Sequence, residues 1–256
     1  MGGRIVTFVN QKGGVGKTTT AVSLAAALGR RGQRVVLVDL DPQANATSAL
    51  GVDGGDRAGV YDALLDEMAI ESCVVTVPDE QVSLVPANRE LSGAEVELVP
   101  VMARERRLST ALEPLRNGYD WILIDCPPSL GLLTINALTA SDNVVIPVQC
   151  EYMALEGLSR LVETLDLVRR NLNPKLSVLG VALTMFDGRT RLAQQVVEEV
   201  RSHFSETFTT IIPRSVRLSE APSHGQSIFR YEPGGRAANA YDALAAELLA
   251  RVGVAV

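Results

Sequence analysis

A glycine-rich loop near the start of the chain reads Asn10-Gln11-Lys12-Gly13-Gly14-Val15-Gly16-Lys17-Thr18-Thr19. The apolar run at 5–9 before it predicts a buried strand, and the alanine-rich run at 21–28 after it predicts a helix. Strand, glycine-rich loop and helix in this order are the setting of a phosphate-binding loop. The glycines let the backbone turn its N–H groups inward, where the positive end of the helix dipole also points. The loop therefore predicts a phosphate site.

The polar side chains of this loop suggest what each of them does. Lys17 is expected to reach the β and γ phosphates of a nucleotide, and the Thr18 hydroxyl is expected to ligate Mg²⁺. The loop also carries a second lysine, Lys12, and two of the three lysines of the chain therefore lie in it. Because lysine offers a compact charge on a flexible stem, we expect both ammonium groups to serve the phosphates. The nucleotide-binding residues expected in the loop are Lys12, Gly13, Gly14, Val15, Gly16, Lys17, Thr18 and Thr19.

Length and composition are typical of one large globular domain. The chain has 256 residues, of which 46% are hydrophobic and 21% charged, and we expect a single domain over 1–256. No apolar run approaches the roughly 20 residues that span a bilayer, and no signal-peptide pattern precedes the first strand. Cys73, Cys126 and Cys150 form no CxxC pair, which suits a reducing compartment. These features predict a cytoplasmic protein.

The charges are unevenly distributed along the chain. The formal net charge of −6 argues against a wholly basic nucleic-acid binder. Residues 41–100 hold 12 acidic and 2 basic side chains, whereas residues 187–236 hold 7 arginines against 6 acids. The net charge therefore leaves room for a local basic surface in the second half of the chain.

Strand-like and helix-like segments alternate along the sequence. Further strands are expected at 34–39, 82–85, 121–125, 144–148, 176–184 and 208–212, and helices at 102–116, 155–168, 192–204 and 237–252. Continuously apolar strands separated by helices predict an α/β fold, with a mainly parallel twisted sheet covered by helices on both faces. Ligands of such sheets bind beyond the carboxyl ends of the strands.

Carboxylates stand at two of these strand ends. Asp39 and Asp41 close the second strand, and one apolar residue between them directs both side chains the same way. We expect Asp41 to orient the water that attacks a γ-phosphate, and Asp39 to lie nearer to Mg²⁺. Asp125 ends another strand and is expected to contact Mg²⁺ together with Thr18. Nearby Mg²⁺ and lysines would favour the charged forms of these acids. The alternative is that they only cap or solvate the turns.

With these segments in view, the chain resembles the ParA/Soj family of chromosome- and plasmid-partitioning ATPases. That family belongs to the deviant Walker A group of P-loop NTPases, which includes MinD-like ATPases. The resemblance covers nearly the whole chain, and its motifs lie at 12–19, 38–45, 123–129, 184–190 and 212–225.

The resemblance implies an ATPase that binds ATP or ADP with Mg²⁺ and hydrolyses ATP slowly. It implies a homodimer with ATP sandwiched between the subunits, in which Lys12 reaches the partner's phosphates. Asp41 matches the water-activating aspartate of the family. Pro213 and Ser215 match the loop that holds adenine, although many relatives carry Asn in place of Ser215.

The resemblance also implies binding to double-stranded DNA without sequence preference, and hence association with the nucleoid. The matching positions are Arg189, expected at the start of a helix, and Arg217, and the supporting residues are Arg191, Arg214 and Arg230. Binding through phosphate contacts would depend strongly on salt. The alternative is that these arginines are solvated or paired with acids. A ParB-like activator is the expected protein partner, and the acid-rich 41–100 region could dock its basic peptide. Because the first strand starts near Arg4, no N-terminal helix-turn-helix is expected.

Several rival functions are less well supported by the sequence. A MinD-like membrane role needs a basic amphipathic C-terminal helix, and only one arginine follows position 236. An iron–sulfur ATPase of the nitrogenase-reductase type needs two cysteines at a dimer interface, and only Cys126 lies beside a site residue. Asp41 and Gln43 argue against a scaffold that does not hydrolyse its nucleotide. The second loop lysine argues against a small-molecule kinase. Relatives that position other cargo share the same motifs, so the motifs do not identify what this protein would move.

Overall fold

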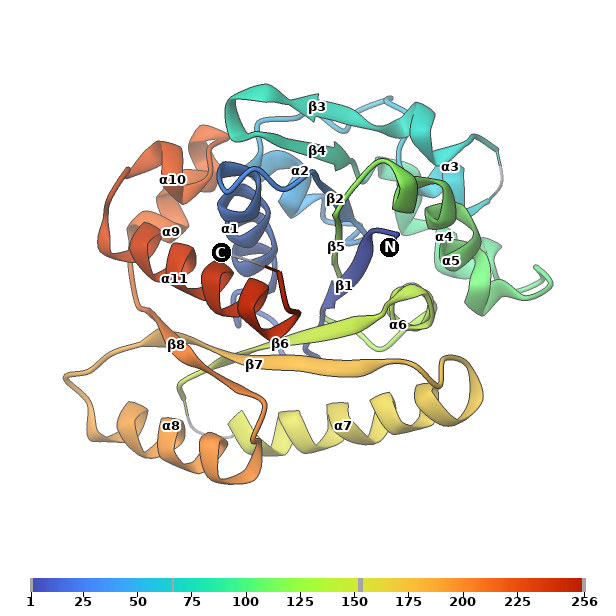
Figure 1. Ribbon diagram of the computed structural model, residues 1–256. Helices are drawn as coiled ribbons and strands as arrows, with labels where there is room; N and C mark the ends of the chain where they lie inside the picture. Colours follow the sequence, from blue (N-terminus) through green and yellow to red (C-terminus); the bar gives the residue numbers. More distant parts are fainter. Residues whose placement is uncertain (1, 66, 152–153, 255–256) are drawn as a thin grey trace.

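The computed structural model describes residues 2–65, 67–151 and 154–254. A single eight-stranded sheet runs through this part of the chain in the order β3-β4-β2-β5-β1-β6-β7-β8 (Figure 1). Every neighbouring pair is parallel except β3 and β4 at one edge, which are antiparallel. The strands are β1 Arg4–Phe8, β2 Val35–Asp39, β3 Val75–Val77, β4 Val82–Val85, β5 Trp121–Asp125, β6 Asn143–Gln149, β7 Ser177–Phe186 and β8 Thr207–Pro213.

Helices cover both faces of this sheet, as predicted. On one face α1, α2, α10 and α11 pack together, and on the other α3 to α6 and the pair α7 and α8 form two neighbouring groups (Figure 1). The helices are α1 Lys17–Arg30, α2 Asn45–Ala49, α3 Val60–Leu64, α4 Ala94–Glu97, α5 Arg107–Leu112, α6 Leu132–Ala140, α7 Ala154–Asn171, α8 Arg191–His203, α9 Arg217–Glu220, α10 Ile228–Tyr231 and α11 Arg236–Arg251.

The strands are continuously apolar because both of their faces are buried. In β2, Val35 and Leu37 pack against the α1 side of the sheet, while Val36 and Val38 pack against the opposite helices. This alternation explains why the sequence shows continuous apolar runs rather than a polar face. It also directs the odd-numbered Asp39 at the end of β2 toward the α1 side.

The structure departs from the predicted elements where the chain carries few long apolar runs. The helix predicted at 102–116 is broken into a 3₁₀ turn, the short α5 and a second 3₁₀ segment at Glu113–Asn117. Pro114 explains the second break, because it has no N–H group to donate within a helix. The three-residue β3 and the helices α2 to α4, α9 and α10, each of four or five residues, were not predicted, because such short segments carry too little periodicity to be recognised. The nine-residue α6 was not predicted either.

The outer strand β8 has many of its backbone groups occupied by side chains of a neighbouring helix. Glu247 of α11 accepts hydrogen bonds from the Thr209 and Thr210 N–H groups, at 2.7 and 2.9 Å. Arg251 of the same helix donates to the Thr207 carbonyl at 3.0 Å and stacks its guanidinium over the Phe208 ring. The helix and the edge strand are therefore joined by polar groups as well as by packing.

We expect Gly180→Ala to destabilise the protein by about 1–3 kcal/mol, the usual cost of overpacking a core. A Cβ atom at Gly180 in β7 would lie 2.3 Å from the ring of Phe208, which is fully buried. Urea unfolding followed by circular dichroism measures the change in the free energy of unfolding.

The matched control is Gly157→Ala in α7, where an added Cβ meets no atom within 4 Å. This substitution should stabilise the helix by about 0.5–1 kcal/mol, because alanine has the higher helix propensity. Equal destabilisation by the two substitutions would contradict the packing argument.

Candidate nucleotide site

The glycine-rich loop connects the end of β1 to the start of α1 and has the conformation that its glycines permit. Gly14 and Gly16 have φ values of 74° and 86°, in the left-handed region that side-chain-bearing residues rarely adopt. Gly16 is also the residue that caps the N-terminus of α1. The loop therefore delivers free backbone N–H groups to the positive end of a 14-residue helix dipole.

Two hydrogen bonds fix the loop to the neighbouring strands. The Thr184 hydroxyl of β7 donates to the Val15 carbonyl at 2.8 Å, and the Asn10 amide donates to the Pro147 carbonyl of β6 at 2.7 Å. The Asn10 side-chain oxygen in turn accepts from the Lys12 N–H at 3.0 Å. These contacts hold the loop in shape without help from a phosphate.

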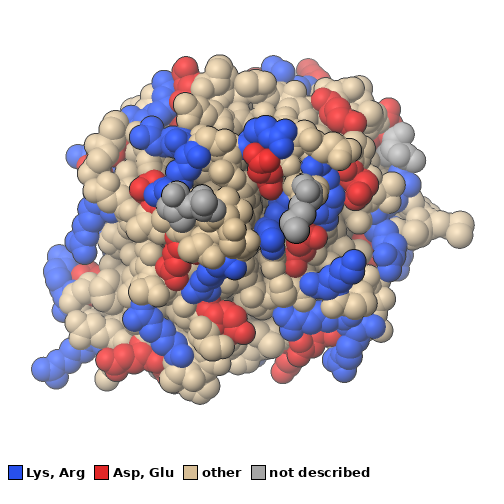
Figure 2. Space-filling view, in the orientation of Figure 1, with Lys and Arg blue, Asp and Glu red and all other residues tan. Residues whose placement is uncertain are grey.

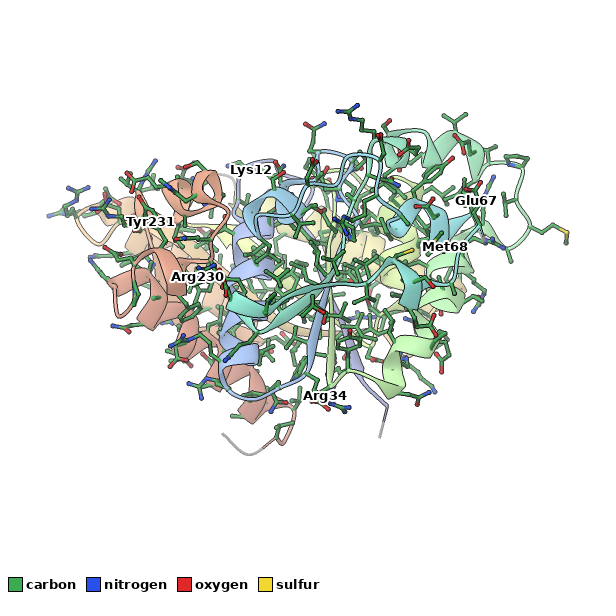
Figure 3. The ribbon with its side chains drawn as sticks, turned by 90° about the horizontal axis from the view of Figure 1, so that it is seen from above. Lys12, Arg34, Glu67, Met68, Arg230 and Tyr231 are labelled. Carbon is green, nitrogen blue, oxygen red and sulfur yellow. The ribbon has the colours of Figure 1, made fainter. Side chains whose placement is uncertain are left out.

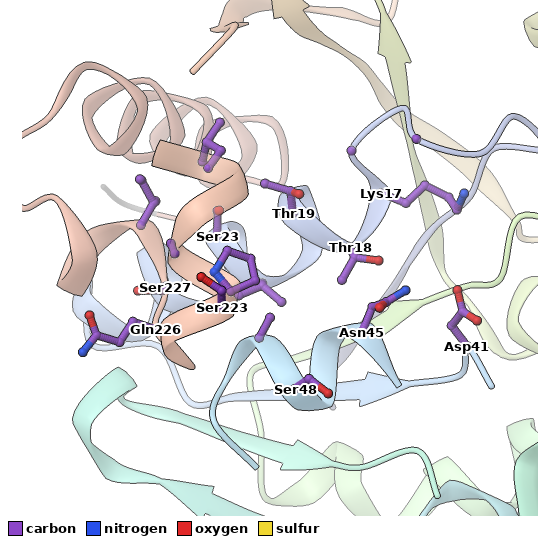
Figure 4. A pocket seen from close by; sticks show the side chains of 18 of the residues that line it. Lys17, Thr18, Thr19, Ser23, Asp41, Asn45, Ser48, Ser223, Gln226 and Ser227 are labelled. Atoms are coloured by element: carbon purple, nitrogen blue, oxygen red, sulfur yellow. The ribbon is translucent and has the colours of Figure 1, made fainter. Parts of the chain in front are cut away.

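A cavity of about 570 Å³ opens over the loop and the start of α1 (Figure 4). Lys17, Thr18, Asn45 and Asp41 surround one end of it, and the hydroxyl groups of α1 and of the segment after α9 surround the other. We call this space the phosphate cavity. Its loop and strand-end lining consists of Gly13, Gly14, Gly16, Lys17, Thr18, Thr19, Asp41, Asn45, Pro128 and Met185.

A second cavity, of about 490 Å³, adjoins the first and extends along the ends of β7 and β8. Pro213 and Ser215, which the family resemblance assigned to adenine, both line it. The two cavities share five lining residues, which are Gly16, Thr19, Met185, Leu218 and Pro222. A ligand with phosphates at the loop can therefore extend into the second cavity, which we call the base cavity.

Lys17 is buried at the base of the phosphate cavity. Its ammonium group donates to the Lys12 carbonyl at 3.4 Å. Burial lowers the pKa of Lys17 below its usual value, and the nearby Asp125 opposes this shift. The buried ammonium group gains most from a phosphate, because the charge interaction is strong where water is excluded.

Asp39 is buried and holds α2 in place. Its Oδ2 accepts hydrogen bonds from the N–H and hydroxyl of Thr47 at 2.8 and 2.7 Å, and its Oδ1 accepts from the Asp41 N–H at 3.2 Å. Burial nevertheless outweighs these bonds and raises the pKa of Asp39 to about 6. Asp39 therefore joins the end of β2 to α2 through Thr47. Its role near Mg²⁺ stays a prediction from the sequence.

Asp125 lies next to Asp39, because the two residues are paired in register at the ends of β5 and β2. Both of its carboxylate oxygens are buried and lack a hydrogen-bond partner among the described residues. Burial, followed by the charge of Asp39, raises the pKa of Asp125 well above its usual value, while Thr18 and Lys17 act in the opposite direction. In the chain without ligands, burial therefore favours the neutral form of Asp125, whereas the sequence analysis predicted the charged form.

An unpaired buried carboxylate beside the Thr18 hydroxyl fits a cation. The described residues contain no group of three or more His, Cys, Asp or Glu side chains placed to hold a metal by themselves. A Mg²⁺ ion at this position would therefore take most of its oxygens from phosphate and water, as Mg²⁺ usually does. The three cysteines, Cys73, Cys126 and Cys150, are free and buried.

Asp41 lies at the rim of the phosphate cavity, across from Lys17 (Figure 4). It is nearly buried, and its Oδ1 accepts the Gln43 N–H at 3.0 Å. The other oxygen, Oδ2, can therefore accept a proton or orient a water molecule. The turn after Asp41 places Ala44 at a φ of 52° as the N-terminal cap of α2.

Lys12 lines neither cavity. Figure 3 shows it at the edge of the molecule opposite to Arg34, which precedes β2. Its side chain is 49% exposed, and its ammonium nitrogen lies 3.9 Å from Oε2 of Glu151. Within the subunit, therefore, only Lys17 of the two loop lysines reaches the phosphate cavity.

Three of the arginines that the sequence singled out lie around the end of β7. Arg189 is 88% exposed and forms an ion pair of 2.6 Å with Asp187, whose pKa it holds far below the usual range. Arg214 also acts on Asp187, and its N–H donates to the Phe186 carbonyl at 2.9 Å. Arg191 begins α8 and is exposed. Arg189 thus lies in the loop before α8 rather than at the helix start.

The other two arginines lie on α9 and α10. Arg217 pairs with Glu220 at 2.8 Å and with Glu232 at 3.5 Å. Arg230 pairs with Asp79 at 3.2 Å, in the turn between β3 and β4. Lysines and arginines are interspersed with acids on the face in Figure 2, where no broad area of one charge is seen among the described residues.

Several residues of the cavities were not found from the sequence. Asn45 and Ser48 face the phosphate cavity from α2, and Leu218 faces both cavities from α9. Met185 lines both cavities with a φ of 52°, a strained conformation for a residue with a side chain. Asn45, Met185 and Leu218 lie within motifs that carry the family resemblance, but no role was assigned to them. Ser48 carried no sequence signal, because it lies on a helix of five residues that periodicity does not reveal.

The fold and the loop define a class of protein: an α/β nucleotide-binding protein with a phosphate loop after its first strand. The sequence profile of the AAA domain family matches residues 3–178. The sporulation initiation inhibitor protein Soj of Bacillus subtilis is 56% identical over 250 residues, which cover 97% of this chain and 99% of that protein. The chromosome partitioning protein ParA of Myxococcus xanthus is 53% identical over 97% of this chain and 89% of its own length. The chain belongs to the Soj/ParA family of chromosome-partitioning ATPases.

A solved structure from Mycobacterium smegmatis has the same fold. It is described as a cobyrinic acid a,c-diamide synthase with a bound ATP analogue and magnesium. It is 38% identical, covers 98% of this chain and 96% of its own, and superposes with a TM-score of 0.88. Within the described residues, no helix combines the length and the apolar character needed to cross a membrane.

We expect Asp125→Asn to change how stability depends on pH in the protein without nucleotide or Mg²⁺. Because burial raises the pKa of Asp125, the folded chain binds more protons than the unfolded one, and the free energy of unfolding falls as pH rises above about 4. The free energy of unfolding of the variant should therefore rise relative to that of the wild type as the pH increases above about 4. Urea unfolding at several pH values measures this gain.

Asp53→Asn is the control, since Asp53 is exposed. It removes one carboxylate charge at the surface and leaves the buried pair of Asp39 and Asp125 intact. An equal pH dependence in the wild type and in Asp125→Asn would show that Asp125 ionises in the folded chain at no cost.

Proposed function

We propose that this protein is an ATP-dependent switch that dimerises around ATP, binds DNA without sequence preference and hydrolyses ATP to segregate chromosomes or plasmids. The observation that carries the proposal is the phosphate cavity, which Lys17, Thr18 and Asp41 line, together with the buried Asp125, which interacts with Thr18 and Lys17 from beneath the surface. Membership of the Soj/ParA family and the ATP analogue in the related structure support the same activity.

The cofactors are ATP or ADP and Mg²⁺. The loop N–H groups and Lys17 bind the β and γ phosphates, and the base cavity with Pro213 and Ser215 receives the adenine. Thr18 and Asp125 would hold Mg²⁺, which when bound neutralises phosphate charge during transfer. Asp39 supports this arrangement from behind through its bonds to Thr47.

Asp41 supplies the group that handles the attacking water. Asp41 lines the cavity, and its Oδ2 can accept a hydrogen bond from a water molecule in line with the γ-phosphate. Lys17 stabilises the charge that develops on the phosphate oxygens. Asp41 lies two residues after the end of β2, and Lys17 is the first residue of α1.

The position of Lys12 supports a dimer. In the subunit its ammonium group lies outside both cavities, so it contributes to phosphate chemistry only from a neighbouring copy. A lysine supplied in this way adds positive charge at the departing phosphate, as an arginine finger does. Slow hydrolysis then depends on the subunits meeting face to face, and a ParB-like activator would act on this assembly.

DNA binding is assigned to Arg189 and Arg217, with Arg191, Arg214 and Arg230 in support. Both main residues are exposed but paired with carboxylates in the free chain. DNA phosphates would have to replace these carboxylates, so each interaction is individually weak and sensitive to salt. Two subunits side by side double the number of phosphates bound, which makes binding depend on the dimer. No membrane partner is proposed.

We expect Asp41→Ala to stop hydrolysis while ATP binding and dimerisation persist, because the residue handles water rather than phosphate. The rate of phosphate release should fall by about a hundredfold or more. Sedimentation velocity with ATP, compared with ADP and with no nucleotide, measures the dimer. Monomers with ATP in this variant would contradict the sandwich, and Lys17→Ala, which removes the buried phosphate ligand, provides the monomeric control.

We expect Arg217→Ala to weaken DNA binding about tenfold without changing ATP affinity. The affinity for DNA should also fall less steeply with salt, by about one unit of slope for each phosphate that the variant no longer neutralises. Arg34→Ala is the matched control, because Arg34 is also an exposed arginine paired with an acid but lies at the opposite end of the strands. Equal DNA retention by both variants would refute the assignment of Arg217.

A further inference from the structure

We propose that Glu151 is a positioning residue for Lys12: it holds the ammonium group within its own subunit until the triphosphate of a second copy displaces it. The inference rests on the proposed ATP-dependent dimer and adds a cost to its formation. Each subunit must release Lys12 from an internal carboxylate before that lysine can serve the partner's nucleotide.

Two hydrogen bonds to Gln149 hold Glu151 beside Lys12. Its Oε2 lies 3.9 Å from the Lys12 ammonium nitrogen. Its other oxygen, Oε1, accepts a hydrogen bond of 2.6 Å from the Gln149 side-chain amide, and its N–H donates to the Gln149 carbonyl at 2.8 Å. The amide thus fixes one oxygen and leaves the other facing the lysine.

The lysine and the carboxylate are carried by connected parts of the sheet. Gln149 ends β6 and is in register with Thr184 of β7. The Thr184 hydroxyl bonds to the Val15 carbonyl in the phosphate loop, three residues from Lys12. Because both partners are anchored to the same pair of strand ends, their approach does not depend on two freely moving loops.

The ion pair between Lys12 and Glu151 is weak enough for a triphosphate to replace the carboxylate. The two side chains are 49% and 46% exposed, and such an ion pair shifts an equilibrium by about fivefold at most. A triphosphate carries more negative charge than one carboxylate and can displace it. Since a symmetric dimer breaks two such pairs, a threefold effect in each subunit becomes about tenfold in the dimerisation constant.

The first test is Glu151→Gln, which keeps the shape and the hydrogen bond to Gln149 but removes the charge. It is made in the Asp41→Ala background so that ATP persists during the measurement. Sedimentation should give a dimer dissociation constant about tenfold lower than that of Asp41→Ala alone. The control is Glu198→Gln on the exposed side of α8, which removes the same charge elsewhere and should change nothing. An unchanged or weakened dimer overturns the proposal.

The second test needs no dimer. The nucleotide-free protein is treated with an acylating reagent, and mass spectrometry follows its three lysines, with exposed Lys175 as internal reference. Removal of the carboxylate charge should speed the modification of Lys12 about threefold relative to Lys175, and 0.5 M salt should reduce this difference. Equal rates at Lys12 in the two proteins overturn the proposal.

The two readouts separate the failure of this inference from that of the proposed function. If Lys12 reacts faster in Glu151→Gln but no variant dimerises with ATP, the ion pair between Lys12 and Glu151 is supported and the proposed ATP-dependent dimer is rejected. A normal ATP-dependent dimer together with no effect of Glu151→Gln on either readout would keep the sandwich but reject the role of Glu151.

Discussion

Two buried carboxylates side by side are the feature on which the site depends. The parallel register of β2 and β5 places Asp39 beside Asp125, and burial raises the pKa of both. Thr47 satisfies Asp39, whereas Asp125 has no hydrogen bond of its own among the described residues. Burial disfavours two charged carboxylates here in the chain without ligands, and positive charge that arrives with a ligand favours their ionised forms.

The central strands and the phosphate loop could be predicted from the sequence, because each of them corresponds to a local sequence pattern. The central strands β1, β2, β5 and β6 are short apolar runs, and each was predicted within one or two residues of its bounds. The glycine pattern and Lys17 predicted the phosphate loop for the same reason. The placement of Pro213 and Ser215 beside the base cavity came from family resemblance instead, since nothing local distinguishes these residues.

The remainder depends on contacts between distant segments, which the sequence does not display. The attachment of Asp39 to Thr47 requires α2, a helix of five residues that periodicity cannot detect. The pairing of Arg217 with Glu232 joins α9 to the residue that follows α10. The left-handed backbone of Met185 is a consequence of tertiary packing in a residue type that gives no local signal.

The polar capping of β8 limits the ways in which copies of this molecule can associate. An outer strand normally offers a row of unpaired N–H and C=O groups, to which a strand of another chain can add. Here side chains of α11 already occupy the groups of Thr207, Thr209 and Thr210, and the opposite edge of the sheet is the three-residue β3. The molecule is therefore poorly suited to growing open-ended fibrils through its sheet, which leaves association to surfaces that a nucleotide can control.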